Sequence, residues 1–345
     1  MKVSMNVRRT VSLALLGGAA LGVGTTASAE VLFNTGAAAT ATIAIGVNPA
    51  GHLNTAVGNV VANAGATGIA YKFDRDGSGP TFQDATSPGC LCEGWGVSAG
   101  AVSGFASVDN GGIGNITVDS FVANAASITS AVSLTSLPGL SVTQVYQTSD
   151  KAPSALFRVD VTIKNDTAGD LTDVRYVRVM DWDVPPSEFD EYVTIKGTGT
   201  TTLLERSHND GFDIPDPLVI TDPIDAVTLD VDFTDYFSVA FEGDHGAYFK
   251  FNFGTVKAGE SFKFSVYYGA AGTERDALAA IGAEGIELYS LGQSNGNQIT
   301  GSPATYIFGF KGVGGVPIEP TPEPGSLALL GLGLAGLGFA RRRRG

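Results

Sequence analysis

Apolar and polar residues alternate along several stretches in the second half of the chain. Phe157, Val159, Val161 and Ile163 occupy every second position, with charged or polar residues between them. A period of two places the apolar set on one face of an extended chain, as in a strand buried on one side. After turn residues at 165–170, residues 171–182 are predicted to return as the partner strand.

A second alternating pair carries aromatic residues. Two runs are separated by a turn at 257–260, and their apolar members are Phe249, Phe251, Phe253, Phe262, Phe264, Val266 and Tyr268. This pattern predicts an antiparallel hairpin whose aromatic face lies in the core.

The remaining pattern predicts a single helix within residues 30–312, near residues 273–289. Thr273 is a candidate N-cap, and Glu274 and Asp276 fall in the first turn. A last strand is predicted around 305–311. The chain has 46 Gly and 19 Phe, which suits short strands joined by tight turns. The fold class predicted for residues 30–312 is all-β, an antiparallel β-sandwich, either one large sandwich or two small ones packed together with a subdivision near residue 150.

The N-terminal 29 residues have the features of a secretory signal peptide. Lys2, Arg8 and Arg9 precede an apolar run at 11–23, which is predicted to be helical. Ala27 and Ala29 form an Ala-x-Ala cleavage site before Glu30. Secretion machinery and signal peptidase are therefore expected partners, and the body of the protein is expected outside the cytoplasm.

The C-terminal end combines a rigid motif, an apolar segment and a basic stop. A Gly/Pro-rich linker at 313–325 contains Pro322, Glu323 and Pro324. The uncharged residues 326–340 would be roughly 22 Å long as a helix, shorter than the roughly 30 Å hydrocarbon core of a bilayer. The chain closes with Arg341, Arg342, Arg343 and Arg344. Such a basic end stays on the cytoplasmic side, so residues 326–345 are predicted to be a transmembrane helix with an arginine stop.

This combination resembles the PEP-CTERM sorting signal of Gram-negative bacteria that make exopolysaccharide. The resemblance implies that a membrane-embedded protease of the exosortase type recognises the Pro-Glu-Pro region and processes the chain. It also implies export through the inner membrane, a transient anchor there, and a final place in the cell envelope or outside the cell. It covers only the C-terminal end and assigns no family to the body.

Charge limits the partners of the body. The chain holds 21 basic and 35 acidic residues, and the segments 1–29 and 326–345 contain seven of the basic residues and none of the acidic ones. The rest therefore has a net charge of −21. Such a surface repels nucleic acid, so no nucleic-acid partner is expected, whereas divalent cations or a cation-bridged matrix suit it.

Two cysteines, Cys90 and Cys92, stand one residue apart. An exported protein meets oxidising conditions, so they are candidates for a local disulfide, which needs a turn at this spacing. An intermolecular bridge is one alternative, and metal binding or redox chemistry is another.

Acidic residues provide the candidates for metal binding. Asp74 and Asp76 precede a glycine turn and resemble the start of a calcium loop, without its terminal glutamate. Asp181 and Asp183 share one face of a strand, roughly 6 to 7 Å apart, within the densest acidic group of the chain. That group also contains Glu188, Asp190 and Glu191. No cofactor is expected apart from calcium at these positions.

Two functions follow from these observations. The first is a noncatalytic envelope or matrix protein associated with exopolysaccharide or surface adhesion, with no catalytic residues. The second is a secreted carbohydrate-binding or carbohydrate-active protein that uses Asp181 and Asp183, with Trp182 and Tyr192 stacking on a sugar.

Overall fold

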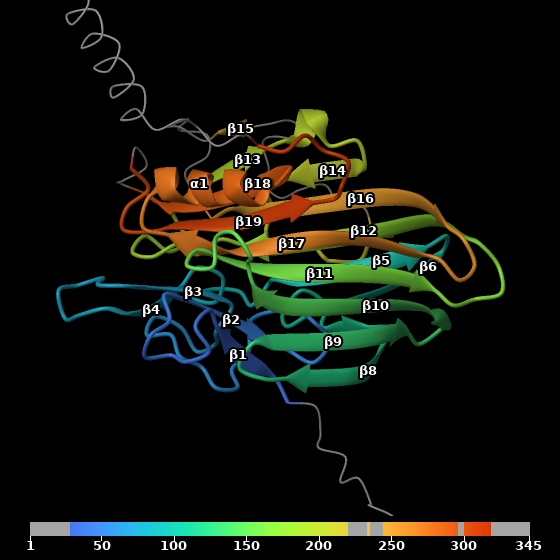
Figure 1. Ribbon diagram of the computed structural model, residues 1–345, viewed down its shortest axis with the longest axis horizontal. Helices are drawn as coiled ribbons and strands as arrows, with labels where there is room; N and C mark the ends of the chain where they lie inside the picture. The colour runs from blue at the N-terminus through green and yellow to red at the C-terminus, as the bar shows by residue number, and fades with distance from the viewer. Residues whose placement is uncertain (1–27, 220–232, 235–243, 296–299, 319–345) are drawn as a thin grey trace, which may run out of the picture.

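The computed structural model describes residues 28–219, 233–234, 244–295 and 300–318 (Figure 1). Antiparallel strands dominate this part of the chain, with one α-helix, α1 (Glu274–Glu284), and one short 3-10 helix, η1 (Thr198–Thr200). The strands form three sheets.

The largest sheet has nine strands. Their order is β15 (Phe233–Thr234), β13 (Glu191–Lys196), β18 (Leu288–Ser294), β19 (Thr305–Lys311), β17 (Ser261–Ala271), β11 (Leu156–Asn165), β10 (Leu137–Thr148), β9 (Ser127–Leu134) and β8 (Ile116–Ala123). The two strands on either side of residue 150, β10 and β11, pair with each other from Leu140–Asn165 to Thr148–Phe157. Both halves of the chain therefore contribute to one sheet.

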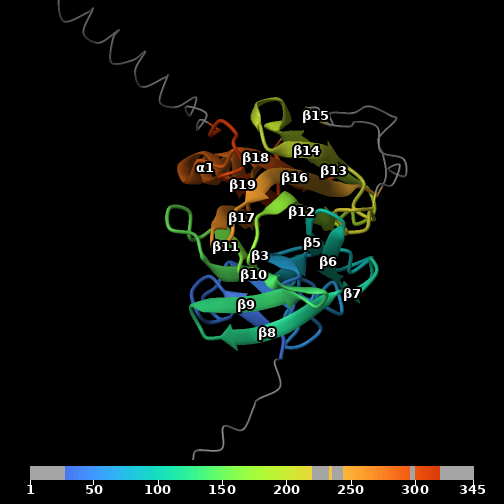
Figure 2. The same ribbon diagram turned by 90° about the vertical axis from the view of Figure 1, so that its right-hand side faces the viewer.

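The second sheet has six strands and packs against one face of the first. Its order is β14 (Leu204–His208), β16 (Gly246–Val256), β12 (Leu171–Asp181), β5 (Gly94–Ala99), β6 (Val102–Ser107) and β7 (Ile113–Gly114). In Figure 2, β12, β5, β6 and β7 of the six-stranded sheet lie to the right of β11, β10, β9 and β8 of the nine-stranded sheet.

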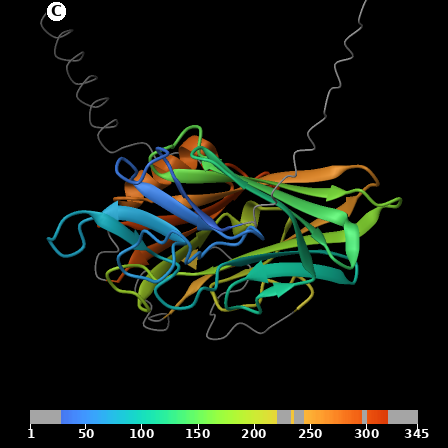
Figure 3. The ribbon, with the colours of Figure 1, turned by 90° about the horizontal axis from the view of Figure 1, so that it is seen from below.

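A smaller sheet lies at one end of the large pair. It contains β1 (Glu30–Phe33), β2 (Ile43–Val47), β3 (Ile69–Phe73) and β4 (Thr81–Asp84), in that order. In the view from below these strands, in blue and cyan, lie beside one end of the long sheets (Figure 3). Their apolar side chains join the same core as the two large sheets.

Aromatic side chains fill the space between the two large sheets. The ring of Tyr176 on β12 meets that of Phe264 on β17 with centroids 4.9 Å apart, and Phe249 on β16 meets Phe308 on β19 at 5.5 Å. Both pairs join residues of different sheets. The aromatic face predicted from the sequence therefore lies in the core.

The strand pairings predicted within this region were wrong. β16 and β17 are consecutive but belong to different sheets, and so do β11 and β12. Phe253 and Phe262 face each other across the core, with ring centroids 4.0 Å apart. In a hairpin the two apolar faces would lie side by side and still need a cover, whereas crossing between the sheets lets each cover the other.

The helix begins where the sequence predicts and ends earlier. The Thr273 side chain accepts a hydrogen bond from the Asp276 backbone N–H at 3.1 Å, and α1 ends at Glu284. Gly285 follows with φ of 69°, a left-handed conformation that glycine adopts at little cost. The residues up to 289, predicted to be helical, instead lead into β18. Ala277, Ala280 and Ile281 attach the helix to the outer face of the nine-stranded sheet.

The packed body extends past residue 312, where the sequence predicts a linker to begin. Val313 is fully buried, and the Glu287 carboxylate accepts backbone N–H bonds from Gly312, Val313 and Gly315, each at 3.0 Å. Glycine allows the chain to approach that carboxylate closely, so the segment packs on the domain as far as Ile318.

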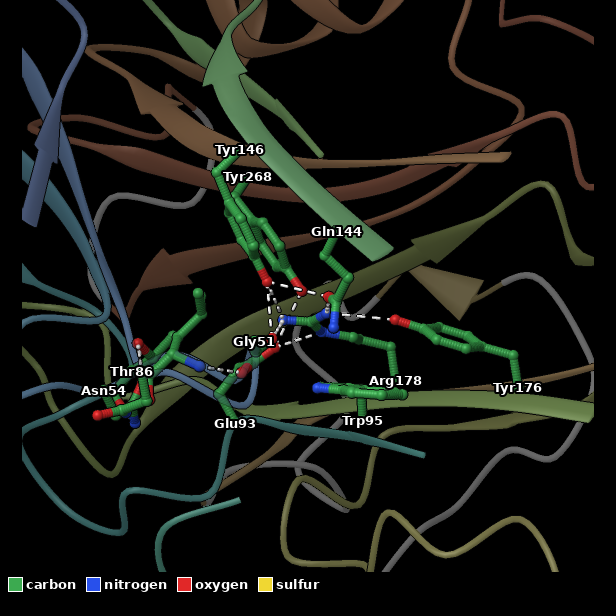
Figure 4. Close-up of polar contacts among 12 residues, drawn as sticks. Gly51, Asn54, Thr86, Glu93, Trp95, Gln144, Tyr146, Tyr176, Arg178 and Tyr268 are labelled. Atoms are coloured by element: carbon green, nitrogen blue, oxygen red, sulfur yellow. Dashed lines mark hydrogen bonds and ion pairs between the residues drawn. The ribbon is translucent and has the colours of Figure 1, made fainter. Parts of the chain in front are cut away.

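A buried ion pair joins the two large sheets to the loop between β2 and β3. Arg178 on β12 donates to Glu93 at 2.5 Å and to Gln144 on β10 at 2.6 Å (Figure 4). Its other contacts include the backbone carbonyl of Gly51 at 3.2 Å. The second oxygen of Glu93 accepts from the Leu53 N–H at 2.7 Å. The charges in the centre of the molecule are thus paired and hydrogen-bonded, as buried charges require.

Candidate metal centre

Asp181 and Asp183 lie where β12 ends. Asp181 pairs with Gly246 at the start of β16, and the Asp183 N–H donates to the Ala85 carbonyl at 2.7 Å. Trp182, between them, is fully buried, and its indole N–H donates to Ser290 on β18 at 3.0 Å. Because neighbouring side chains of an extended segment point to opposite sides, both aspartates face away from that tryptophan.

Asp244 joins these two residues from the segment before β16. One carboxylate oxygen from each of Asp181, Asp183 and Asp244 lies within 4.8 Å of the other two. Asp181 is 1% exposed and Asp183 is 0% exposed, whereas Asp244 is partly exposed. The group therefore has a buried side and a side open toward solvent.

A fourth carboxylate reaches this group from the nine-stranded sheet. Glu191, the first residue of β13, is 2% exposed, and one of its oxygens accepts from the His245 N–H at 2.8 Å. That bond places the carboxylate beside the segment that carries Asp244. We refer to Asp181, Asp183, Glu191 and Asp244 as the acidic centre.

Several oxygens of the acidic centre have no hydrogen-bond partner in the described part of the chain. They are both oxygens of Asp181, Oδ1 of Asp183, Oδ1 of Asp244 and Oε2 of Glu191. None of the four carboxylates forms an ion pair with a described lysine or arginine. By contrast, the buried charges of Arg178 and Glu93 are paired with each other.

Burial and mutual repulsion raise the pKa values of these acids. Burial raises the pKa of Asp183 to about 7, and the charge of Asp244 adds to the effect. Burial followed by the charge of Asp183 raises the pKa of Asp181 well above its usual range. The pKa of Glu191 is raised well above its usual range by burial and the charge of Asp181, and that of Asp244 is raised by burial. Such a group can retain protons or bind a hard cation.

Two glycines bring neighbouring loops against the acidic centre. A Cβ on Gly211 would lie 2.7 Å from Oδ1 of Asp181, and a Cβ on Gly89 would lie 2.9 Å from Oδ1 of Asp183. The Gly89 N–H donates to Oδ2 of Asp183 at 3.2 Å. A larger residue at either position would push into the carboxylates.

The cysteine pair stands next to this contact. The structure joins Cys90 and Cys92 by a disulfide, with Cα atoms 5.1 Å apart. The bridge directly follows Gly89, so it restrains the chain next to the residue that donates to Asp183.

The other predicted calcium position is an ordinary turn between β3 and β4. The Asp74 carboxylate accepts from the Gly77 N–H at 2.7 Å, and that of Asp76 accepts from the Ser78 N–H at 3.0 Å. Both residues are exposed. Their oxygens are used to hold the turn itself, so the structure does not bring the two carboxylates into a set of ligands.

Of the dense acidic group in the sequence, only part reaches the acidic centre. Glu188 pairs with Arg75 at 2.6 Å, and Asp190 accepts from the Asn295 side chain at 2.7 Å. Asp244 was missed, because it lies about 60 residues from Asp183 and no spacing connects them. The nearest sequence signal is Gly246, which allows β16 to begin close to Asp181.

A cavity of about 450 Å³ lies elsewhere, under α1. It is lined mostly by alanines, together with Tyr71, Lys151 and Asp276. It shares no residue with the acidic centre, and the unpartnered polar atoms of the acidic centre make that site the better candidate.

Comparison with known proteins concerns the C-terminal end. Residues 320–344 match the PEP-CTERM protein-sorting motif. The chain carries this sorting signal. The PEP-CTERM motif implies an exported protein that is sorted to the cell surface and processed by an exosortase. No curated protein and no solved structure matches the chain.

The terminal predictions fall largely outside the described residues. These are the signal peptide up to Ala27, Pro322, Glu323 and Pro324, the apolar segment, and Arg341 to Arg344. Within the described ranges, no helix is both long enough and apolar enough to cross a membrane. Ala29 and Glu30 are described, and Glu30, the residue expected to follow signal cleavage, is the first residue of β1.

Proposed function

We propose that the protein is a noncatalytic component of the cell envelope or extracellular matrix, associated with exopolysaccharide and delivered there by exosortase processing. The observation that carries the proposal is the PEP-CTERM motif at 320–344, which directly follows the β body. The net charge of −21 on residues 30–325, which include that body, supports a role in a hydrated, cation-bridged polysaccharide layer.

The burial of the alternative sugar site supports a noncatalytic role. Trp182 is 0% exposed, and its ring lies against Tyr306 at 6.4 Å between centroids. Asp181 and Asp183 are as deeply buried. A sugar chain needs an open aromatic face and accessible carboxylates, so these residues are poorly placed to act on a polysaccharide.

Cell fractionation tests the sorting step. Glu323→Gln changes the centre of the motif, and Glu319→Gln makes the same change just outside the matched residues. We expect the first variant to accumulate uncleaved in the inner membrane, and the second to be processed like the wild type. Equal processing of both variants would contradict the role given to the motif.

A polysaccharide-deficient strain tests the final location. The processed protein should remain with the cell surface or matrix in the parent strain and appear free in the medium when exopolysaccharide synthesis is deleted. Unchanged retention in the deficient strain would exclude association with exopolysaccharide while leaving sorting intact.

A further inference from the structure

The acidic centre holds more buried negative charge than the described residues neutralise. Asp181 and Asp183 are at most 1% exposed, and together they have three oxygens without a hydrogen-bond partner. Elsewhere in the same core the charge of Arg178 is matched by Glu93. Buried carboxylates are normally paired, hydrogen-bonded or bound to a metal ion, so the acidic centre lacks a positive partner.

Glu191 provides an independent sign of a ligand. It comes from a different sheet and is 2% exposed, and its Oε1 is fixed by the His245 N–H, while Oε2 has no partner. His245 directly follows Asp244, so this hydrogen bond fixes the Glu191 carboxylate beside the segment that carries one of the three aspartates. Three carboxylates from the end of β12 and the segment before β16 thus lie within 4.8 Å of one another, and the carboxylate of Glu191 on β13 is fixed beside them by the residue that follows Asp244.

We infer that the acidic centre binds a calcium ion, with Asp181, Asp183 and Asp244 as ligands and Glu191 as the fourth carboxylate. The three ligand oxygens lie within 4.8 Å of one another. Oxygens on opposite sides of a calcium ion are about 4.6 to 5.2 Å apart, because Ca–O distances are about 2.3 to 2.6 Å. Calcium also accepts irregular sets of oxygens, as these segments offer, whereas magnesium requires a near-octahedral set and retains several waters.

The ion would connect the two large sheets at one end of the molecule. Asp181 belongs to the six-stranded sheet and Glu191 to the nine-stranded sheet. Binding would replace repulsion between the carboxylates by attraction to a shared ion, so the folded state gains stability as calcium rises. Extracellular modules commonly bind calcium with dissociation constants of about 10⁻⁴ to 10⁻³ M, which suits an exported protein.

Calorimetry and thermal unfolding of the purified full chain, freed of metal with EDTA, test this inference without reference to sorting. Calcium, added as the chloride, should bind at one site per chain. At a calcium concentration about 100 times the dissociation constant, Tm should rise by roughly 5 °C. Magnesium chloride at the same concentration should give a much smaller shift.

Variants separate the acidic centre from general effects of acidity. Asp181→Asn and Asp244→Asn should each weaken calcium binding at least tenfold. Asp181→Asn should fold without calcium at least as well as the wild type, because it removes a buried charge. Asp244→Asn provides a second variant at a partly exposed position. Asp74→Asn, in the turn between β3 and β4, is the matched control and should bind calcium within twofold of the wild type.

Three results would overturn the inference. The first is no heat of binding and no rise in Tm for the wild type. The second is wild-type affinity in both Asp181→Asn and Asp244→Asn. The third is an equal response to magnesium, which would exclude calcium as the preferred ion.

Discussion

Arg178 shows how a single residue can hold distant parts of the chain together. It is 0% exposed and contacts Glu93, Gln144 and the Gly51 carbonyl, which come from both large sheets and from the loop between β2 and β3. Removing one partner of a buried ion pair leaves the other charge uncompensated, which costs more than the pair contributes.

Glu93→Gln should therefore lower the free energy of unfolding by roughly 3 to 5 kcal/mol. Urea unfolding at neutral pH measures the change. The control is Asp166→Asn at the exposed pair with Lys164, where a loss below about 1 kcal/mol is expected. Similar losses in both variants would show that the burial of Arg178 does not determine the effect.

His52, in the same region as Arg178, makes the free energy of unfolding depend on pH. Burial and then the charge of Arg178 lower the pKa of His52 from 6.5 to about 3. Below pH 6.5 the imidazole of His52 binds a proton in the unfolded chain but stays neutral in the folded chain. The free energy of unfolding therefore falls by about 1.4 kcal/mol per pH unit until about pH 3.

Comparison with His52→Gln isolates this contribution from other acids. Between pH 7 and pH 4.5 the wild type should lose about 2.5 kcal/mol more than the variant in urea unfolding. Parallel pH profiles for the two proteins would contradict a depressed pKa for His52.

At the scale of elements, alternation in the sequence identifies strands and their buried faces but not their partners. β11 follows the pattern from Phe157 to Ile163, with these apolar positions buried. The same pattern fits a hairpin and a crossing between facing sheets, because both bury alternate residues. Only the rest of the core decides between them, so the partners of β12 and β17 were not predictable from local spacing.

The acidic centre illustrates the same limit. Asp181 and Asp183 are recognisable because two residues along a strand share a face. Asp244 and Glu191 join them only through the pairing of β12 with β16 and the packing of β13 nearby. The start of helix α1 was predicted from the sequence because its cap at Thr273 is a local signal, whereas its end at Gly285 lies before the predicted end at 289.

The loop closed by Cys90 and Cys92 should influence calcium binding without providing a ligand. The residue just before it, Gly89, donates its N–H to Asp183, and the disulfide limits the conformations of the chain at this point. The double variant Cys90→Ser, Cys92→Ser should bind calcium severalfold more weakly in calorimetry, because the loop must be ordered on binding. Reduction of the wild type should have the same effect, and unchanged affinity in both cases would separate the disulfide from the site.

On the scale of the whole molecule, one core joins all three sheets. It includes Leu32 of β1, Tyr176 of β12 and Phe310 of β19, one residue from each sheet. We expect the body to unfold as one cooperative unit. Hydrogen exchange in low denaturant should give the same opening free energy for β2–β3 and for β17–β19. Separate exchange of the first 120 residues of the body would show two independent units.

The attachment of Ile318 to the body limits the distance between the body and the C-terminal apolar segment. Its N–H donates to the Ile286 carbonyl at 2.8 Å, beside the end of α1. Seven residues, 319–325, separate it from the apolar segment predicted to begin at residue 326, a reach of at most about 25 Å when fully extended. With the tail inserted in a bilayer, the end of the molecule that carries α1 would face the membrane from within about that distance. The protease would then have to cut in a narrow gap under a folded domain, with β8 on the side facing away from the cell.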